Sequence, residues 1–249
     1  MNLIILTESD RIDAGRYRLS DHRAEHIRAV LNLGEGDTVE VGVLNGPVGT
    51  ARLLKVSGEE VELQGDEWRE TITSKPEIDL ICALPRPQTV KKVLLTAAMM
   101  GVRSVHLIRA NRVEKSYFQS PLIEPGNQLP YLIEGLAQGR LTRLPAVQVH
   151  DRFRRFFEDE LDGLISKAEE TPQRLLCSPE TTDTLDSVFD ARVGQVTIAI
   201  GPEGGWVPFE IELMQERGFR PFTLGRWTLR VEHAVTSALA QVELCRRSP

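Results

Sequence analysis

The sequence Val196-Thr-Ile-Ala-Ile200, followed directly by Gly201-Pro-Glu-Gly-Gly205, indicates both the fold and a ligand site. The first half is a short apolar run, which predicts a buried strand. The second half has three glycines in five positions, and glycine permits backbone conformations and close approaches that a Cβ atom would block. Pro202 fixes one further backbone angle in the turn. We predict that a buried strand ends here in a loop that grips a ligand; an ordinary turn between a strand and a helix is the alternative.

A second loop of the same kind follows, where Phe222-Thr-Leu-Gly225 runs into Arg226-Trp-Thr-Leu-Arg230. Ser178-Pro179 comes after another apolar run, at residues 175–177. The carboxyl ends of parallel strands meet at one edge of a sheet, and open α/β sheets hold their ligands there. The three loops therefore predict a single ligand site.

From Pro76 onward the chain alternates between short apolar runs and amphipathic stretches. This alternation is typical of an α/β domain with a mainly parallel sheet that is covered on both faces. The predicted strands are 78–84, 105–108, 147–149, 175–177, 196–200 and 222–224. The predicted helices are 89–100, 129–136, 153–168, 210–216 and 232–246. The last helix has an apolar face that suits either the core or a subunit interface, formed by Ala234, Val235, Ala238, Leu239 and Val242.

Before Pro76 the pattern is that of a smaller, β-rich module. A helix is predicted from Ser20 or Asp21, since either residue can cap it, and its apolar stripe consists of Ala24, Ile27, Val30 and Leu31. Short β-like runs follow, with turns at Asn45-Gly46 and Ser57-Gly58. The polar stretch 67–76 ends in a proline, which is typical of a linker. We therefore predict two domains, 1–72 and 73–249.

The composition excludes several classes of protein. A net charge of −6 with 27% charged residues argues against a uniformly basic nucleic-acid coat, so any contact with RNA has to be local. The three cysteines, Cys82, Cys177 and Cys245, form no Cys-x-x-Cys pair, which argues against a disulfide scaffold or a thiolate zinc site. No apolar run approaches the length of about 18 residues that a membrane helix needs. We expect a cytoplasmic protein.

Two common nucleotide-binding motifs are missing from the predicted site. The chain has no Gly-x-Gly-x-x-Gly after its first strand, which a dinucleotide site needs, and no Gly-Lys-Ser/Thr for a nucleoside triphosphate. The remaining candidate is a compact nucleoside that is held by main-chain groups from several loops.

Both glycine loops resemble the C-terminal signature of a known family. The residues Gly201-Pro-Glu-Gly-Gly205, Leu224-Gly225 and Leu229-Arg230, with Glu232 and Ala234, are similar to the signature of the RsmE family of 16S rRNA uridine N3-methyltransferases. In the N-terminal module, His26-Ile-Arg-Ala-Val-Leu31 followed by Gly36-Asp37 also resembles the family pattern. The order of a β-rich module, a linker and an α/β domain matches the family along nearly the whole chain.

The resemblance implies a fold, a cofactor and an assembly. It implies a SPOUT-type methyltransferase domain with a trefoil knot in its C-terminal segment, preceded by a small PUA-like or OB-like β-rich domain that binds RNA. Family members bind S-adenosylmethionine in the knotted loops, act on 16S rRNA of the small ribosomal subunit and work as homodimers, and no metal is implied. At the matching positions the predicted cofactor-binding residues are Leu176, Ser178, Pro179, Ile200, Gly201, Pro202, Gly204, Gly205, Leu224, Gly225, Thr228 and Leu229.

The resemblance also implies which residues carry the chemistry. The N3 atom of uridine is a poor nucleophile while it is protonated, so a site has to remove that proton or stabilise the resulting anion. Glu232 is the predicted base, Arg230 the predicted stabiliser of negative charge on the uracil oxygens, and Glu203 a second candidate carboxylate. The structural alternative is an ion pair between Arg230 and Glu232, or a capping role for Glu232 at the last helix.

The chain departs from the family pattern at Trp227, His233 and Ala137, where the family has arginine, threonine and glutamate. Trp227 suits stacking on a nucleobase, and His233 is a further candidate for the catalytic base. These departures bear on the target nucleotide more than on the cofactor. They leave open a related SPOUT enzyme that acts on another RNA position, and an RNA- or ribosome-binding module without turnover.

Scattered basic residues in the N-terminal module predict local contacts with RNA phosphates. The predicted RNA-binding residues are Arg11, Arg16, Arg18, His26 and Arg28. His22 and His26 have the four-residue spacing of a metal-binding pair, but no third ligand accompanies them in the sequence. We therefore predict no metal site.

Overall fold

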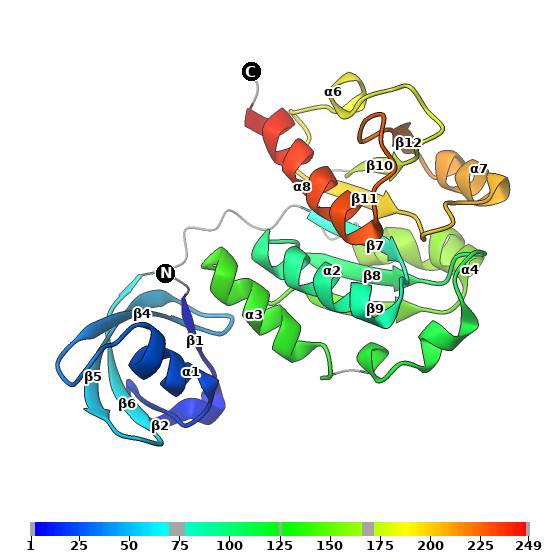
Figure 1. Ribbon diagram of the computed structural model, residues 1–249. Coiled ribbons are helices and arrows are strands. Elements are labelled where there is room, and N and C mark those ends of the chain that lie inside the picture. The colour runs from blue at the N-terminus through cyan, green and yellow to red at the C-terminus, as the bar shows by residue number, and fades with distance from the viewer. Residues whose placement is uncertain (1–2, 70–77, 125, 166–171, 248–249) are drawn as a thin grey trace. The chain divides into compact units, whose positions relative to one another are not determined.

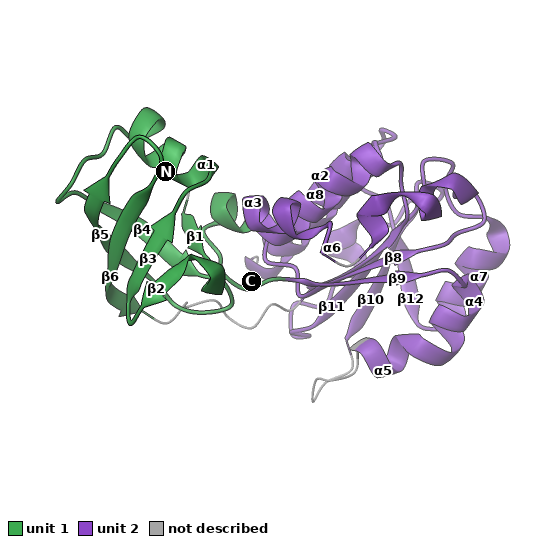
Figure 2. Cartoon of the chain, turned by 90° about the horizontal axis from the view of Figure 1, so that it is seen from below, with its two compact units in different colours: residues 1–73, 136–144 green, residues 74–135, 145–249 purple. Residues whose placement is uncertain are grey.

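The computed structural model describes residues 3–69, 78–124, 126–165 and 172–247. The chain divides into two compact units (Figure 2): unit 1 consists of residues 1–73 and 136–144, and unit 2 of residues 74–135 and 145–249. The predicted domain boundary, between residues 72 and 73, lies outside the described residues. The division into 1–72 and 73–249 therefore stays a prediction.

Unit 1 is built on a curled sheet whose described strands lie in the order β1-β4-β5-β6-β3-β2 (Figure 1). β1 and β4 pair in parallel, and the other neighbours are antiparallel. Asn45, at a φ of 59°, and Gly46 form the turn between β4 and β5, as predicted. The strands are β1 (Ile4–Leu6), β2 (Arg11–Asp13), β3 (Arg16–Leu19), β4 (Thr38–Val43), β5 (Val48–Val56) and β6 (Val61–Arg69).

A helical stretch follows β3 in unit 1. Asp21 caps it, because the Asp21 carboxylate accepts a hydrogen bond from the backbone amide of Arg23 at 2.9 Å. The stretch is α-helical over α1 (His22–Glu25) and continues as a π-helical turn, η2 (His26–Val30). Since a π turn contains more residues than an α turn, it displaces the side chains that follow. Val30 is 67% exposed, so its predicted place on the apolar stripe was wrong.

The core of unit 1 is formed by alternate residues of its strands, together with Ala24 and Ile27 of the helical stretch. Along β3, Tyr17 and Leu19 are buried, whereas the two arginines beside them are exposed. Successive side chains of a strand point to opposite faces, so the arginines of this strand lie on the outer face of the sheet.

A segment from much later in the sequence completes unit 1. The backbone amide of Leu3 donates a hydrogen bond to the carbonyl of Ala137 at 2.9 Å. The guanidinium of Arg140 forms an ion pair with Glu40 at 2.7 Å. Residues 136–144 thus supply hydrogen bonds and an ion pair to a sheet whose strands end at residue 69.

Unit 2 is built on a parallel sheet in the order β12-β10-β11-β7-β8-β9. Every residue of β7, β8 and β11 is buried, as expected for a parallel sheet with helices on both faces. The predicted α/β class is confirmed. The strands are β7 (Ile78–Ala83), β8 (Ser104–Ile108), β9 (Ala146–His150), β10 (Gln173–Cys177), β11 (Val196–Ile200) and β12 (Phe219–Phe222).

Helices cover both faces of this sheet. α2 and α8 lie side by side on one face, and α4 and α5 lie on the other (Figures 1 and 2). The apolar residues of α8 from Ala234 to Val242 are buried within unit 2, so that face of the helix belongs to the core. The helices of unit 2 are α2 (Pro87–Met99), α4 (Phe153–Arg155), α5 (Leu161–Ile165), α6 (Leu185–Val188), α7 (Pro208–Glu216) and α8 (Val231–Arg247), with the π-helical turn η5 (Phe156–Glu160) and the 3-10 turns η3 (Lys115–Gln119) and η4 (Pro121–Ile123). α3 (Leu129–Gly139) begins in unit 2 and ends in unit 1, and the 3-10 turn η1 (Glu8–Asp10) belongs to unit 1.

Two elements of unit 2 differ from their prediction. The predicted helix 153–168 is interrupted by η5, and its last residues lie outside the described ones. The last strand is 219–222 rather than 222–224. Phe219 and Phe222 are buried there with Pro221 between them, and a strand tolerates proline at the edge of a sheet, which is where β12 lies. The chain therefore leaves the sheet at Thr223, and residues 223–230 form a loop.

Candidate active site

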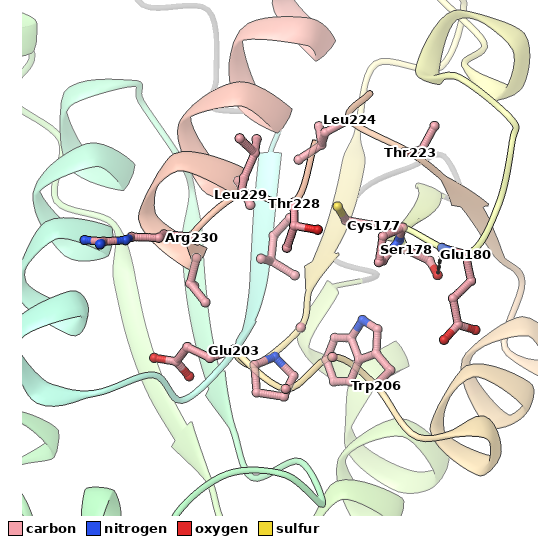
Figure 3. A pocket seen from close by; sticks show the side chains of 18 of the residues that line it. Cys177, Ser178, Glu180, Glu203, Trp206, Thr223, Leu224, Thr228, Leu229 and Arg230 are labelled. Atoms are coloured by element: carbon pink, nitrogen blue, oxygen red, sulfur yellow. Dashed lines mark hydrogen bonds between the residues drawn. The ribbon is translucent and has the colours of Figure 1, made fainter. Parts of the chain in front are cut away.

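Loops at the carboxyl ends of β10, β11 and β12 enclose a cavity of about 480 Å³ (Figure 3). The loops come together because β10 pairs in parallel with both β11 and β12. The lining residues are Arg112, Cys177, Ser178, Pro179, Glu180, Ile200, Gly201, Pro202, Glu203, Gly204, Gly205, Trp206, Ile211, Thr223, Leu224, Gly225, Trp227, Thr228, Leu229, Arg230, Val231 and Ala234.

The cavity collects all of the predicted cofactor-binding residues except one. Leu176 does not line it, whereas the next residue, Cys177, does. Leu176 is fully buried in β10, and since neighbouring side chains of a strand point to opposite faces, the two residues cannot both face the cavity. The three loops that the sequence singled out thus lie around one space.

The glycine loop has little room for side chains. Gly205 has a φ of 73°, a left-handed conformation that favours glycine. A Cβ atom on Gly201 would lie 3.1 Å from Nε1 of Trp206, so the indole ring packs directly over the backbone of Gly201. Nε1 of Trp206 is buried and has no hydrogen-bond partner among the described residues. A donor in this position can pair with a ligand in the cavity.

Arg112, from the segment that follows β8, holds the glycine loop by hydrogen bonds to its backbone. Its Nη1 donates hydrogen bonds to the carbonyl of Gly204 at 2.5 Å and to that of Trp206 at 3.5 Å. A Cβ atom on Gly204 would lie 3.1 Å from Cδ of Arg112, so this side chain packs closely against the loop. The loop after β11 is therefore fixed by a residue that comes about 90 positions earlier in the chain.

The loop after β10 is joined to β12. The backbone amide of Ser178 donates a hydrogen bond to the carbonyl of Phe222 at 2.9 Å, and Ser178 is buried. Burial raises the pKa of the Cys177 thiol to about 12. Cys177 is therefore a neutral wall residue at physiological pH and not a nucleophile, because only the thiolate attacks.

The loop after β12 is anchored at its start. The Thr223 hydroxyl and the backbone of Gly225 form reciprocal hydrogen bonds of 3.0 and 3.3 Å. Nε2 of Gln241, on α8, donates a hydrogen bond to the carbonyl of Leu224 at 3.3 Å. Residues 225–230 beyond these anchors are exposed. The segment thus presents its side chains to the cavity and to solvent.

Charged groups occupy opposite ends of the cavity. Arg230 and Glu203 lie at one end, and Glu180 lies at the other, beside Trp206 (Figure 3). The carboxylate of Glu203 accepts a hydrogen bond from the backbone amide of Arg86 at 3.4 Å and lies 3.8 Å from Nε of the same residue. The guanidinium of Arg230 forms no ion pair with any residue that the structure describes. The end of the cavity with Arg230 and Glu203 therefore offers an unpaired guanidinium beside a carboxylate.

Glu232, the predicted base, is not a lining residue of the cavity. Its carboxylate lies 3.1 Å from Nζ of Lys92, on α2. A backbone hydrogen bond within the first turn of α8 lowers the pKa of Glu232; burial opposes this effect, and Lys92 adds to it. Glu232 therefore pairs with Lys92 rather than with Arg230, and it also sits in the first turn of α8, where the sequence allowed a capping role.

Several lining residues were missed by the sequence analysis: Arg112, Glu180, Trp206, Ile211, Thr223 and Val231. Trp206 follows the glycine loop directly, and its large ring next to three glycines was a usable signal. Arg112 had no signal, since nothing in its neighbourhood indicates that the segment after β8 reaches the loop after β11.

The predicted RNA-binding residues lie in unit 1, and the exposed ones are already paired. Arg18 forms an ion pair with Glu62 at 2.8 Å, and Arg11 with Glu8 at 3.4 Å. Arg16 pairs with Asp13. His26 and Arg28 are half-buried in η2, and Nε of Arg28 donates to the carbonyl of Ala24 at 3.3 Å. An RNA phosphate would have to compete with a carboxylate for each of the three exposed arginines.

Comparison with known proteins identifies the family. Residues 73–243 match the family model described as an RNA methyltransferase domain. The chain is 32% identical over 243 residues to Ribosomal RNA small subunit methyltransferase E of Treponema pallidum, covering 96% of this chain and 90% of that protein. The chain belongs to the RsmE family of RNA methyltransferases. A second RsmE relative, Ribosomal RNA small subunit methyltransferase E 1 of Borreliella burgdorferi, is 22% identical and covers 96% of this chain and 95% of that protein.

Two solved structures share the RsmE fold of this chain. One is a Ribosomal RNA small subunit methyltransferase E from Neisseria gonorrhoeae bound to S-adenosyl methionine, with a TM-score of 0.75, 20% identity and coverage of 98% of this chain and 97% of that chain. The other is a methyltransferase from Legionella pneumophila in complex with the same cofactor, with a TM-score of 0.74, 22% identity and coverage of 98% of both chains. At these identities the likeness establishes the fold.

The described residues of this RsmE member show neither a metal-binding cluster nor a membrane-spanning helix. Within the described ranges, no group of three or more histidine, cysteine, aspartate or glutamate side chains is placed to hold a metal ion. Across the part of the chain that the structure describes, no helix has the length and apolar character needed to cross a membrane.

Proposed function

We propose that this protein uses S-adenosylmethionine to methylate N3 of a uridine in the 16S rRNA of the small ribosomal subunit. The observation that carries the proposal is the single cavity formed by the three loops after β10, β11 and β12, with a free guanidinium and a carboxylate at one end. Membership of the RsmE family and the names of its relatives support rRNA as the substrate.

The residues of the cavity fit S-adenosylmethionine. A volume of about 480 Å³ lies within the range of small-molecule sites. Ile200, Leu224 and Leu229 offer apolar contacts for an adenine ring, and the unpaired Nε1 of Trp206 is a donor for one of its nitrogens. The carboxylate of Glu180 can accept hydrogen bonds from ribose hydroxyls. The cofactor, when bound, supplies an electrophilic methyl group.

The chain's own residues prepare the uracil. Arg230 is placed to stabilise negative charge on the uracil oxygens after the N3 proton has left, because its guanidinium is free of ion pairs within the described residues. Glu203, at the same end of the cavity, is better placed than Glu232 to act as the base, because Glu203 lines the cavity and Glu232 does not. Glu232 remains a candidate only if its pair with Lys92 opens.

The proposal also covers the knot, the RNA-binding domain, the cellular compartment and the oligomeric state. We propose that the C-terminal segment forms a trefoil knot, that unit 1 acts as a PUA-like RNA-binding domain through Arg11, Arg16, Arg18, His26 and Arg28, and that the enzyme is a cytoplasmic homodimer. These features are supported by the signature residues of both glycine loops and by family membership.

The test is to map methylated nucleotides in small-subunit rRNA by mass spectrometry, from a strain that lacks the gene and from its parent. We expect N3-methyluridine to be lost and to be restored by the gene but not by Arg230→Ala. Loss of a different methyl group, with N3-methyluridine unchanged, would indicate the related SPOUT enzyme with another target. No change in any methyl group would indicate an RNA-binding module without turnover.

A further inference from the structure

Trp227 is the most exposed large hydrophobic side chain in the described part of the chain, at 77%. It lies in the loop after β12 and lines the same cavity as Arg230 and Glu203. Trp206, also a lining residue, is only 4% exposed. One indole of this cavity is thus packed as part of its wall, whereas the other presents most of its ring surface to solvent.

The surroundings of Trp227 are cationic. Arg226 precedes it and Arg230 follows three residues later, and both side chains are exposed. Neither guanidinium has an ion-pair or hydrogen-bond partner within the described ranges, whereas the exposed arginines Arg16 and Arg18 of unit 1 are paired with carboxylates. A protein with a net charge of −6 therefore keeps two unpaired cations beside the most exposed large hydrophobic side chain of its described residues.

An exposed ring between free cations matches the chemistry of an unpaired nucleotide. A base that has left its stack offers two flat faces for an aromatic side chain, and its flanking phosphates attract arginine. The reacting atom of a base in a duplex is inaccessible, so enzymes that modify bases take them out of the stack and hold them in a pocket. A ring at the edge of the cavity can hold such a base next to the groups that act on it.

We propose that Trp227 is the stacking platform that holds the extruded target base at the cavity, with Arg226 and Arg230 contacting the nucleotide around it. The proposal rests on the proposed function and assigns to it a specificity-determining residue. Trp227 is 77% exposed, which distinguishes it from Trp206, a buried residue in the wall of the cofactor cavity.

Kinetic measurements with small subunits from the strain that lacks the gene test the role in catalysis. We expect Trp227→Ala to lower kcat/KM for the RNA about 5- to 100-fold, the range that corresponds to the loss of one stacked base. Trp227→Phe, which keeps an aromatic face, should retain most of kcat/KM. The affinity for S-adenosylmethionine, measured by calorimetry, should stay the same in both variants. The control is Leu244→Ala on α8, a 65% exposed apolar side chain outside the cavity, which should change neither quantity.

Fluorescence tests the stacking itself, independently of turnover. The chain contains three tryptophans, and Trp227 is far more exposed than Trp68 at 36% or Trp206 at 4%. We expect a short oligouridylate to quench the fluorescence of the native protein and to leave that of Trp227→Phe almost unchanged. If the native protein is quenched in this way but transfers no methyl group to rRNA, the proposed function fails and the stacking role stands.

Three results would overturn the inference. Equal quenching of the native protein and Trp227→Phe would show that no base stacks on this ring. A loss of cofactor affinity in Trp227→Ala as large as its loss of kcat/KM would make the residue part of the cofactor site. A change from dimer to monomer in sedimentation of Trp227→Ala would show that a second copy of the chain covers the ring.

Discussion

The buried carboxylate of Glu210 accepts a hydrogen bond from the backbone amide of Asn111 at 2.7 Å. Its other oxygen accepts one from the amide of Val207 at 2.9 Å, at the start of α7. Asn111 precedes Arg112, which holds the glycine loop, and Val207 follows Trp206, which packs over it. One carboxylate thus fixes both segments that contact the glycine loop.

Replacing Glu210 should destabilise the protein strongly. Glu210→Ala leaves two backbone amides without their acceptor, at about 1–3 kcal/mol each. We expect the melting temperature to fall by several degrees in calorimetry, and the affinity for S-adenosylmethionine to fall with it. Glu212→Ala, an exposed position on the same helix, is the control and should change stability by less than about 0.5 kcal/mol. Equal melting temperatures for the two variants would contradict the role of Glu210.

The pair between Lys92 and Glu232 makes a prediction about pH dependence. Lys92 contributes to lowering the pKa of Glu232, so Lys92→Met should raise that pKa. If Glu232 is the base, the acidic limb of the pH profile of kcat/KM should move to higher pH in this variant. Lys91→Met is the control, because Nζ of Lys91 lies over the ring of Tyr131 instead.

An acidic limb that stays in place in Lys92→Met would exclude Glu232 as the base. Glu203 would then be the remaining carboxylate, and Glu203→Gln should lower kcat by about 10²- to 10⁴-fold, the usual contribution of a general base. Glu232→Gln should in that case affect stability more than turnover, since it weakens the contact between α2 and α8.

A buried histidine pair should make unit 2 sensitive to acid. Nδ1 of His106 lies 3.2 Å from Nε2 of His150, and burial, followed by the effect of His150, lowers the pKa of His106 to about 4 from its ordinary 6.5. Below pH 6.5 the unfolded chain binds a proton at His106 that the folded protein does not bind until about pH 4. The free energy of unfolding should therefore be fully retained above about pH 6.5 and fall as the pH is lowered towards 4.

Urea unfolding at pH 7 and pH 5 measures this effect. We expect His106→Gln to lose about 2 kcal/mol of the difference in stability between the two pH values, because it removes one titrating group over about 1.5 pH units. His233→Gln, at an exposed position on α8, should keep the full difference. The same pH dependence in His106→Gln as in the native protein would show that other groups carry it.

The contact between Gly201 and Trp206 predicts that the glycine loop cannot take a larger residue. In Gly201→Ala the new Cβ atom would lie 3.1 Å from Nε1 and 3.2 Å from Cε2 of Trp206, so the ring has to move. Overpacking of this kind costs about 1–3 kcal/mol, and we expect cofactor binding to weaken roughly tenfold in calorimetry. Gly58→Ala, where no atom lies within 4 Å of the new Cβ, is the control. Equal cofactor affinity in both variants would show that Trp206 can yield without loss.

Much of the site could be predicted from the sequence because its loops carry their own signals. Glycines mark the loop after β11, and apolar runs place the strands that bring Ser178, Gly201 and Leu224 together. What escaped prediction depends on tertiary contacts. No local sequence pattern predicts the hydrogen bond from Arg112 to Gly204 or the pairing of Glu232 with Lys92, since each joins segments far apart in the chain.

For the fold, too, local patterns predicted the elements, whereas features that depend on tertiary structure were missed. Periodicity predicts the alternation of strands and helices, but the predicted last strand lies about three residues too far along the chain. Proline is tolerated in an edge strand, and only the tertiary fold shows that β12, with Pro221, is an edge strand. The π turn η2 exposed Val30 because apolar periodicity assumes a regular α-helix. Both errors arise from geometry that neighbouring residues do not encode.

Unit 1 can be completed only late in the synthesis of the chain, because it includes residues 136–144. Its last segment includes Thr142, whose hydroxyl donates to the carbonyl of Gly46 at 2.7 Å, and whose own carbonyl accepts from the amide of Asn45 at 2.7 Å. These bonds cannot form until β7, α2, β8 and α3 of the chain have already left the ribosome. The first unit to be translated is therefore finished only after the second has begun, and a fragment that stops at residue 73 would leave the turn at Asn45 without these two partners.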